Sequence, residues 1–138
     1  MGFLKNLFKK KEQYTERTFP AQDWPEQITL ERNHDNEDDL YLIKNPTFDE
    51  IMGFLQSMYD DADQFVILTM PELKNGIRYI QACQAPEGIY VQLGMEKDGT
   101  IKLIEKCYDS SETSEVFEKF FKEGIVDHID TFSPVLFK

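Results

Sequence analysis

The residues best suited to chemistry are carboxylates that gather in two short segments. Residues 33–39 read NHDNEDD and hold one histidine with four acids, His34, Asp35, Glu37, Asp38 and Asp39. Residues 60–63 read DDAD and hold three acids, Asp60, Asp61 and Asp63. Carboxylates beside a histidine can ligate a divalent cation, but the first segment lacks the D-x-D-x-D-G spacing and the final Glu of a calcium loop. We therefore expect neither a metal site nor another cofactor.

A cysteine with a histidine offers a second chemistry, that of a nucleophile and its base. Cys83 or Cys107 could be activated by His128, but both cysteines lie within predicted strands, where an inert buried thiol is the usual state. Those strands flank a third, which separates the thiols by roughly 9–10 Å, too far for a disulfide. The chain also lacks G-x-S-x-G, a P-loop, a G-x-G-x-x-G that opens a helix, and the spacing of a zinc site. The sequence favours a protein that is not an enzyme.

Charge divides the chain into a basic start and an acidic body. The 138 residues carry a formal net charge of −11, from 15 basic and 26 acidic side chains. Residues 1–11, MGFLKNLFKKK, contain four lysines and no acid, so residues 12–138 hold 11 basic and 26 acidic side chains, or −15. Such a body repels nucleic acid and anionic membranes, and it favours a basic partner or simply solubility.

Residues 1–11 predict a short basic amphipathic helix, with four apolar side chains on one side, Phe3, Leu4, Leu7 and Phe8. Such a helix can lie on an anionic membrane or dock on a partner. The plainer alternative is a frayed tail or a helix packed on the body, because eleven residues make a marginal helix alone. The sequence shows no signal peptide and no run long enough to span a membrane. We therefore expect residues 12–138 to form one cytoplasmic domain.

The elements that must position these residues centre on a three-stranded meander. Three runs of β-branched, aromatic and aliphatic residues, separated by turn residues, predict strands over 77–83, 89–95 and 101–107. For the second turn we expect a three-residue loop over 97–99, which pairs Met95 with Ile101 and keeps one face apolar. A two-residue loop over 98–99 would place Met95 opposite Lys102 and mix charges into the buried face.

Two helices and further strands are predicted around the meander. Thr47 and Glu50 form a capping box that opens a helix over 48–59, and residues 109–112 cap a second helix, over 111–123, that ends before Gly124. An alternating pattern predicts a hairpin of strands 27–32 and 40–44. The apolar run 65–70 reads as a buried strand that Pro71 stops.

The predicted fold class is therefore α+β. We expect a mostly antiparallel sheet of about six strands in the order β-β-α-β-β-β-β-α, with both helices on one face. The other face would stay partly open, as a dimer surface or as the place where the N-terminal segment lies. The irregular segment 12–26 is expected to tuck its aromatic side chains, including Trp24, against the sheet.

In size, acidity, element order and lack of a catalytic motif, the whole chain resembles the small cytoplasmic immunity proteins that bacteria keep beside polymorphic or secreted toxins. The likeness is most suggestive around YIQACQAPEGIYVQLG and FEKFFKEG. It implies a protein partner, such as a basic toxin whose cleft an acidic surface could clamp. The hypothetical contact surface comprises Trp24, Asp35, Glu37, Asp38, Asp39, Tyr59, Asp60, Asp61 and Asp63.

Two other functions stay open at this point. The chain could be an adaptor or structural domain whose basic segment, residues 1–11, attaches the acidic body to a membrane or an assembly. It could also be a small-molecule enzyme with a site between sheet and helices, because a pocket leaves no mark on a sequence.

Overall fold

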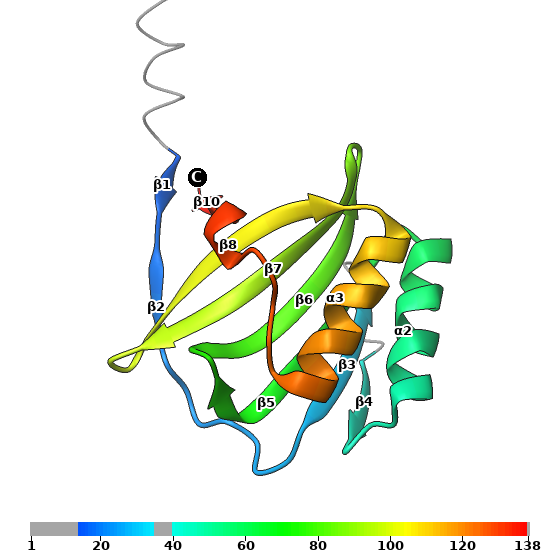
Figure 1. The fold of residues 1–138 in the computed structure, drawn as a ribbon, viewed down its shortest axis with the longest axis horizontal. Coiled ribbons are helices and arrows are strands. Elements are labelled where there is room, and N and C mark those ends of the chain that lie inside the picture. Colours follow the sequence, from blue (N-terminus) through cyan, green and yellow to red (C-terminus); the bar gives the residue numbers. More distant parts are fainter. Residues whose placement is uncertain (1–13, 35–39, 138) are drawn as a thin grey trace, which may run out of the picture.

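The protein has an α+β fold in which a strongly twisted antiparallel sheet carries two helices on one face (Figure 1). The computed structural model describes residues 14–34 and 40–137. The predicted basic segment 1–11 lies outside the described residues. In chain order the elements are β1 (Thr15–Glu16), β2 (Thr18–Pro20), β3 (Thr29–His34), β4 (Tyr41–Lys44), α2 (Phe48–Asp60), β5 (Gln64–Lys74), β6 (Ile77–Ala85), β7 (Gly88–Lys97), β8 (Thr100–Tyr108), α3 (Ser110–Glu123), η1 (Ile129–Thr131), β9 (Ser133–Pro134) and β10 (Leu136–Phe137).

The main sheet runs in the order β2-β8-β7-β6-β5-β3-β4, and its described pairings are antiparallel. The expected hairpin, buried strand and meander are confirmed as β3–β4, β5 and β6–β8. Four short strands lie at the ends of the chain: β1 and β2 were not predicted, whereas the apolar tail 131–138, which holds β9 and β10, was expected as a last edge strand or as a segment laid over the core. Of these, β2 and β9 both pair with the outer edge of β8, and β1 pairs with β10. One edge of the sheet is thus covered, while β4 forms the other edge.

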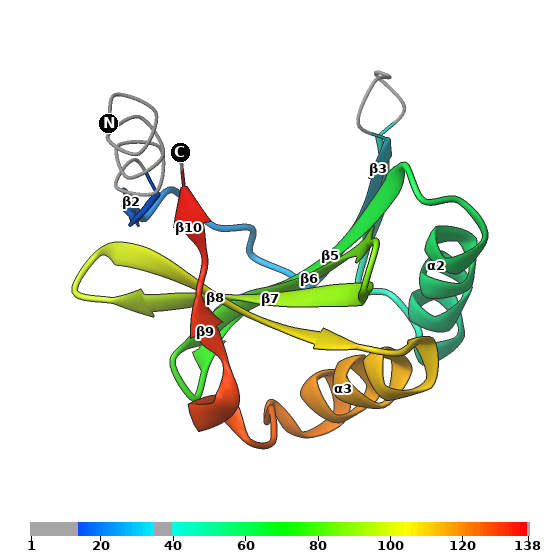
Figure 2. The same ribbon diagram turned by 90° about the horizontal axis from the view of Figure 1, so that it is seen from above.

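Both helices lie on the same face of the sheet, as expected (Figure 2). Each begins at a capping box, Thr47 with Glu50 and Asp109 with Glu112, because these side chains satisfy amides that have no partner inside the helix. Gly124 ends α3 in the left-handed conformation, with φ 71°. The core between helices and sheet is built from fully buried side chains, among them Leu30, Ile51, Leu55, Met58, Leu68, Ile80, Leu93, Phe117 and Phe120.

The expected three-residue loop between β7 and β8 is wrong. Asp98 and Gly99 form a two-residue turn with φ 51° and 77°, so Lys97 pairs with Thr100 and Met95 with Lys102. Positive φ at both central residues is the geometry that matches the twist of a hairpin. The charge that argued against this register lies near the covered edge of the sheet, where the Lys102 ammonium meets a carboxylate of Glu16 on β1 at 3.1 Å. A long lysine stem can lie along apolar surface while its charge reaches a partner.

Pro71 does not stop β5, contrary to expectation. The strand continues to Lys74, with a register shift against β6 between Thr69 and Lys74. A proline lacks an N–H, and a bulge is one of the places in a sheet that tolerate it. The carbonyl of Pro71 accepts a hydrogen bond from Arg78 Nη1 at 2.8 Å, so a side chain replaces part of the broken ladder.

The two cysteines lie where the meander predicted, on either side of Tyr90 in one row across β6, β7 and β8. The expectation that both thiols are buried is wrong, because Cys107 is exposed and Cys83 is half-buried. Their row faces away from the helices, on the side of the sheet that carries only partial cover. We call this side the open face.

Candidate functional site

The open face is crossed by the irregular segment after β2, which covers part of it (Figure 2). We call residues 19–25, which comprise the last two residues of β2 and the irregular segment that follows, the strap. Beneath the strap lies a hollow of about 300 Å³, walled by strap residues and floored by strands β3, β5 and β6. A second hollow of about 390 Å³ adjoins it towards β4 and shares four of its lining residues, Gln22, Trp24, Glu31 and Thr69. Together they form a groove that reaches from β8 to Leu42 on the edge strand.

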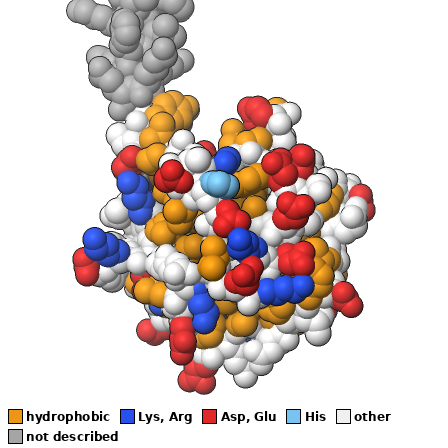
Figure 3. All heavy atoms as spheres, viewed as in Figure 1, with side chains coloured by type: hydrophobic (Ala, Val, Ile, Leu, Met, Phe, Trp, Pro, Cys, Tyr) orange, Lys and Arg blue, Asp and Glu red, His pale blue; other side chains and the backbone are white. Residues whose placement is uncertain are grey.

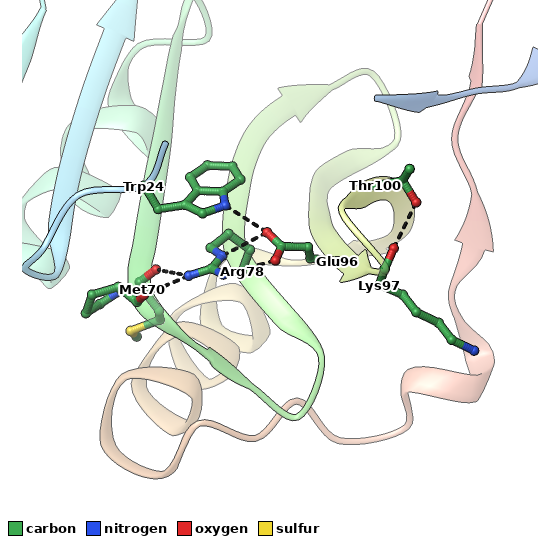
Figure 4. Close-up of polar contacts among 7 residues, drawn as sticks. Trp24, Met70, Arg78, Glu96, Lys97 and Thr100 are labelled. Atoms are coloured by element: carbon green, nitrogen blue, oxygen red, sulfur yellow. Dashed lines mark hydrogen bonds and ion pairs between the residues drawn. The ribbon is translucent and has the colours of Figure 1, made fainter. Parts of the chain in front are cut away.

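Trp24 is held in place by a polar network on the sheet (Figure 4). Its indole Nε1 donates to Glu96 Oε1 at 2.7 Å, and the guanidinium of Arg78 lies 5.1 Å from the ring centroid. Arg78 forms a bidentate pair with Glu96 through Nε and Nη2, both at 3.1 Å, and its Nη1 donates to the carbonyls of Met70 and Pro71. The hydrogen bonds from Arg78 first, and then from Trp24, lower the pKa of Glu96 below its ordinary value. The strap is therefore anchored by an ion pair that is itself almost fully buried.

Tyr79 supports the strap from below. Its ring centroid lies 6.1 Å from that of Trp24, and burial raises the pKa of its phenol. The ring lies over Gly94 of the next strand, where a Cβ would come within 2.5 Å of two ring carbons. Only glycine leaves room for an aromatic ring to lie this close to a neighbouring strand.

Glu31 is the one acidic side chain that the two hollows share. It is half-buried, and burial raises the pKa of its carboxyl above the ordinary value. Within the part of the chain that the structure describes, the carboxylate makes no hydrogen bond and no ion pair. A half-buried carboxylate without a partner has lost part of its hydration, and no hydrogen bond or ion pair compensates for the loss. A ligand could supply that interaction.

The floor of the hollow belongs to a row of five side chains that crosses the sheet from β3 to β8. The registers align Glu31 with Ile67, and then with the polar members of the row, Gln81, Gln92 and Glu105. The amide nitrogen of Gln81 donates to the Gln92 oxygen, and Gln92 Nε2 donates to Glu105 Oε1 at 2.9 Å. Glu31 and Gln81 therefore flank Ile67 on strands two spacings apart, roughly 9–10 Å.

The structure does not bring the two predicted aromatic contact residues together. Trp24 belongs to the strap on the open face, whereas Tyr59 lies on the helix side, where its hydroxyl donates to the carbonyl of Ser110 and contacts Ser114 Oγ at 2.8 Å. Cys107 and His128 are also apart. Cys107 is on the open face, while His128 lines a hollow with Lys106 and Tyr108, whose side chains alternate to the other face.

The acidic run at the end of α2 leads into β5, where Gln64 lies opposite the end of β3, the neighbour of the edge strand. Asp60 closes α2, and Asp61 caps it, with Oδ1 accepting from the amide of Asp63 and Oδ2 from Gln64 Nε2, both at 3.1 Å. Gln64 in turn accepts from Ser57, which accepts from Arg32. The remaining predicted acids, Asp35, Glu37, Asp38 and Asp39, lie outside the described residues, but β3 ends at His34 directly opposite Gln64.

Arg32 links this acidic run to the edge strand. Its guanidinium lies 4.4 Å from the ring centroid of Tyr41 on β4 and 5.2 Å from that of Phe54 on α2. Tyr41 stands in a row of three exposed apolar residues, with Leu40 55%, Tyr41 51% and Leu42 47% exposed. We call Leu40–Leu42 with Asp60–Asp63 the acidic edge, because an exposed apolar strand and three carboxylates share one corner of the molecule.

On the face that carries α3, charges of both signs are interspersed with apolar side chains (Figure 3). No group of three or more possible metal ligands occurs among residues 14–34 and 40–137. Of the helices that the structure describes, none combines the length and apolar character needed to cross a lipid bilayer.

Sequence reasoning named Trp24 but missed the residues around it. Glu31 looked like an ordinary polar position of an alternating strand, and Arg78 and Glu96 belong to strands whose register was not expected. The only signal in the sequence was the single Trp followed by Pro25. Comparison with protein-family models, with curated proteins and with solved structures gave no match.

Proposed function

We propose that this protein works by binding another protein at the acidic edge, without catalysis. The observation that carries the proposal is the edge strand β4, which ends the described sheet and exposes Tyr41 and Leu42, with the exposed Leu40 directly before it. An uncovered edge offers backbone N–H and C=O groups to an added strand, and exposed apolar side chains give that strand something to pack on. Natural proteins usually protect such edges, so an apolar and open one favours a binding role.

Charge supports a basic partner. Asp60, Asp61 and Asp63 lie at the same corner as β4, and the connection from β3 to β4 adds four more acids in the sequence. A body of net charge −15 attracts a basic protein before contact and discriminates against acidic ones. The resulting hypothesis is a cytoplasmic immunity protein that neutralises a basic bacterial toxin, which inserts an extended segment along β4.

The test is affinity capture of the tagged protein in its source lysate, at low and high salt, followed by a binding titration with the captured partner. We expect a stoichiometric basic partner that is lost at high salt. Asp60→Lys combined with Asp63→Lys, and separately Leu40→Asp, should weaken binding by about tenfold or more, equivalent to about 1.4 kcal/mol. If the partner has an activity, equimolar protein should abolish it.

Matched controls exist elsewhere on the surface. Leu136 on β10 is 56% exposed, close to the 55% of Leu40, and Asp130 is an exposed acid on η1. Leu136→Asp and Asp130→Lys should leave the dissociation constant unchanged. Equal weakening by the control variants, or a partner that ignores all of them, would contradict binding at the acidic edge.

The adaptor alternative attaches the body through residues 1–11. The described chain begins just before β1, which pairs with β10, and removal of residues 1–11 changes no residue of the acidic edge. Partner binding that survives the deletion supports the acidic edge. Loss of localisation or of binding on deletion supports the adaptor instead.

A further inference from the structure

The hollow beneath the strap has the parts of a cation site, and none of its lining residues belongs to the acidic edge. Aromatic rings of Trp24, Tyr79 and Phe19 line it, and the half-buried Glu31 contributes a carboxylate that has no ion-pair partner in the described chain. Aromatic rings with a carboxylate are the combination that recognises organic ammonium ions, because ring faces and the carboxylate both attract positive charge. We propose that this hollow binds the ammonium group of a small organic cation.

The row of side chains on the floor of the hollow determines where the positive charge of the ligand would lie. Glu31 and Gln81 stand on either side of Ile67, so a ligand resting on Ile67 has an acceptor at each flank. Gln81 already donates its amide nitrogen to Gln92, and its carbonyl oxygen has no hydrogen bond within the described residues. The positive charge of an ammonium group can therefore be met by an anionic and a neutral oxygen, while the alkyl part packs on Ile67.

The size of the hollow limits the ligand. About 300 Å³ is at the lower end of ligand pockets and is enough for a small amine or for one lysine side chain. Among the described residues, no basic side chain near the hollow pairs with Glu31 in place of the proposed ligand. Arg78 is neutralised by its bidentate pair with Glu96, and Lys44 on β4 forms no ion pair with Glu31 within the described residues.

The single Trp of the chain lines the hollow, so its fluorescence reports binding directly. We would titrate the intact protein with choline and with its uncharged isostere 3,3-dimethylbutan-1-ol. The proposal expects a saturable change in Trp24 emission with choline and none with the alcohol. Glu31→Gln should weaken the response by about tenfold or more, the factor that one charge-assisted contact supplies. Glu72→Gln, an exposed acid on β5 outside both hollows, should not.

A second pair of probes separates the two sources of the same chemistry. N-acetyl-lysine-amide represents a side chain of a partner protein, and choline represents a free metabolite. Binding of either, if lost in Glu31→Gln, supports the site and tells which source fits it. Affinity should fall as the pH drops through the raised pKa of Glu31, because protonation removes the charge. The titratable or charged groups near Glu31 that bear on this pH dependence are Tyr79, Asp23, Lys44 and the Arg78–Glu96 pair.

The outcomes that overturn the proposal are specific. No saturable response to any ammonium probe, an equal response to the uncharged alcohol, or undiminished binding by Glu31→Gln would each refute it. These results are independent of the acidic edge, since the variants at Leu40, Asp60 and Asp63 change neither hollow. Failure of one proposal can therefore be told from failure of the other.

Discussion

At the scale of single residues, the open face depends on the absence of one Cβ atom. The ring of Tyr79 occupies the space where a side chain of residue 94 would stand, and Trp24 lies next to that ring. Gly94→Ala should therefore displace Tyr79 and lower the free energy of unfolding by about 1–3 kcal/mol, the usual cost of overpacking. Urea denaturation measures the loss, and a shift in Trp24 emission should accompany it.

A second glycine provides the control for this change. Gly53 is exposed within α2, and a Cβ added there would contact no neighbouring element within 4 Å, so alanine adds helix propensity without a clash. Gly53→Ala should raise the free energy of unfolding by about 0.5–1 kcal/mol and leave Trp24 emission unchanged. Similar effects of the two substitutions would show that Tyr79 does not depend on Gly94.

Glu31 illustrates how a half-buried carboxylate without a partner costs stability. Burial raises its pKa in the folded protein, so between the unfolded pKa and this higher value the folded state binds more protons. The free energy of unfolding therefore falls as the pH rises through that window. Glu31→Gln removes the titration and should stabilise the protein at pH 7 more than at pH 4, as thermal unfolding at the two pH values would show. A variant less stable at pH 7 would mean that the carboxylate has a structural role.

At the scale of elements, local signals and distant ones differ in how well the sequence displays them. The capping boxes at Thr47 and Asp109 use contacts three residues apart, so helices α2 and α3 could be predicted with their starting positions. The register between β7 and β8 could not be predicted. The argument against the observed register assumed that the lysines of β8 would have no partner. Residues far along the chain, such as Glu16, supply the partner for Lys102.

The covered edge of the sheet is maintained by very short elements. β9 pairs with β8 at Ile104 and Glu105, and the ring of Phe137 on β10 lies 5.3 Å from that of Phe19 on β2. Removal of residues 133–138 should uncover the part of this edge that β9 covers, while β2 stays paired, and cause self-association at concentrations where the intact chain does not associate. Light scattering after size-exclusion chromatography measures the mass. Removal of Lys138 alone is the control and should change nothing, and an equally monodisperse truncated chain would contradict the protective role.

At the scale of the whole molecule, the sequence predicted the layers but not the site. Alternation and helical spacing showed which side chains form the core. The α+β class and the shared helix face are confirmed, and the predicted order matches that of the longer elements, β3 to α3. The groove could not be predicted, because its walls come from the strap, β3, β5, β6 and β8. Periodicity shows that Glu31 and Gln81 each face one side of a strand, but only strand order and register place them in one row.

The unequal edges of the sheet also limit how copies of this chain can join. β2 and β9 occupy the outer side of β8, while the outer side of β4 is open among the described residues, so each molecule offers one site for strand addition. A unit with a single such site can pair once, after which no edge is left for a third. Assembly of the intact protein through this edge would therefore stop at a dimer. A chain with both edges uncovered could bind another copy at each edge and could grow into a filament.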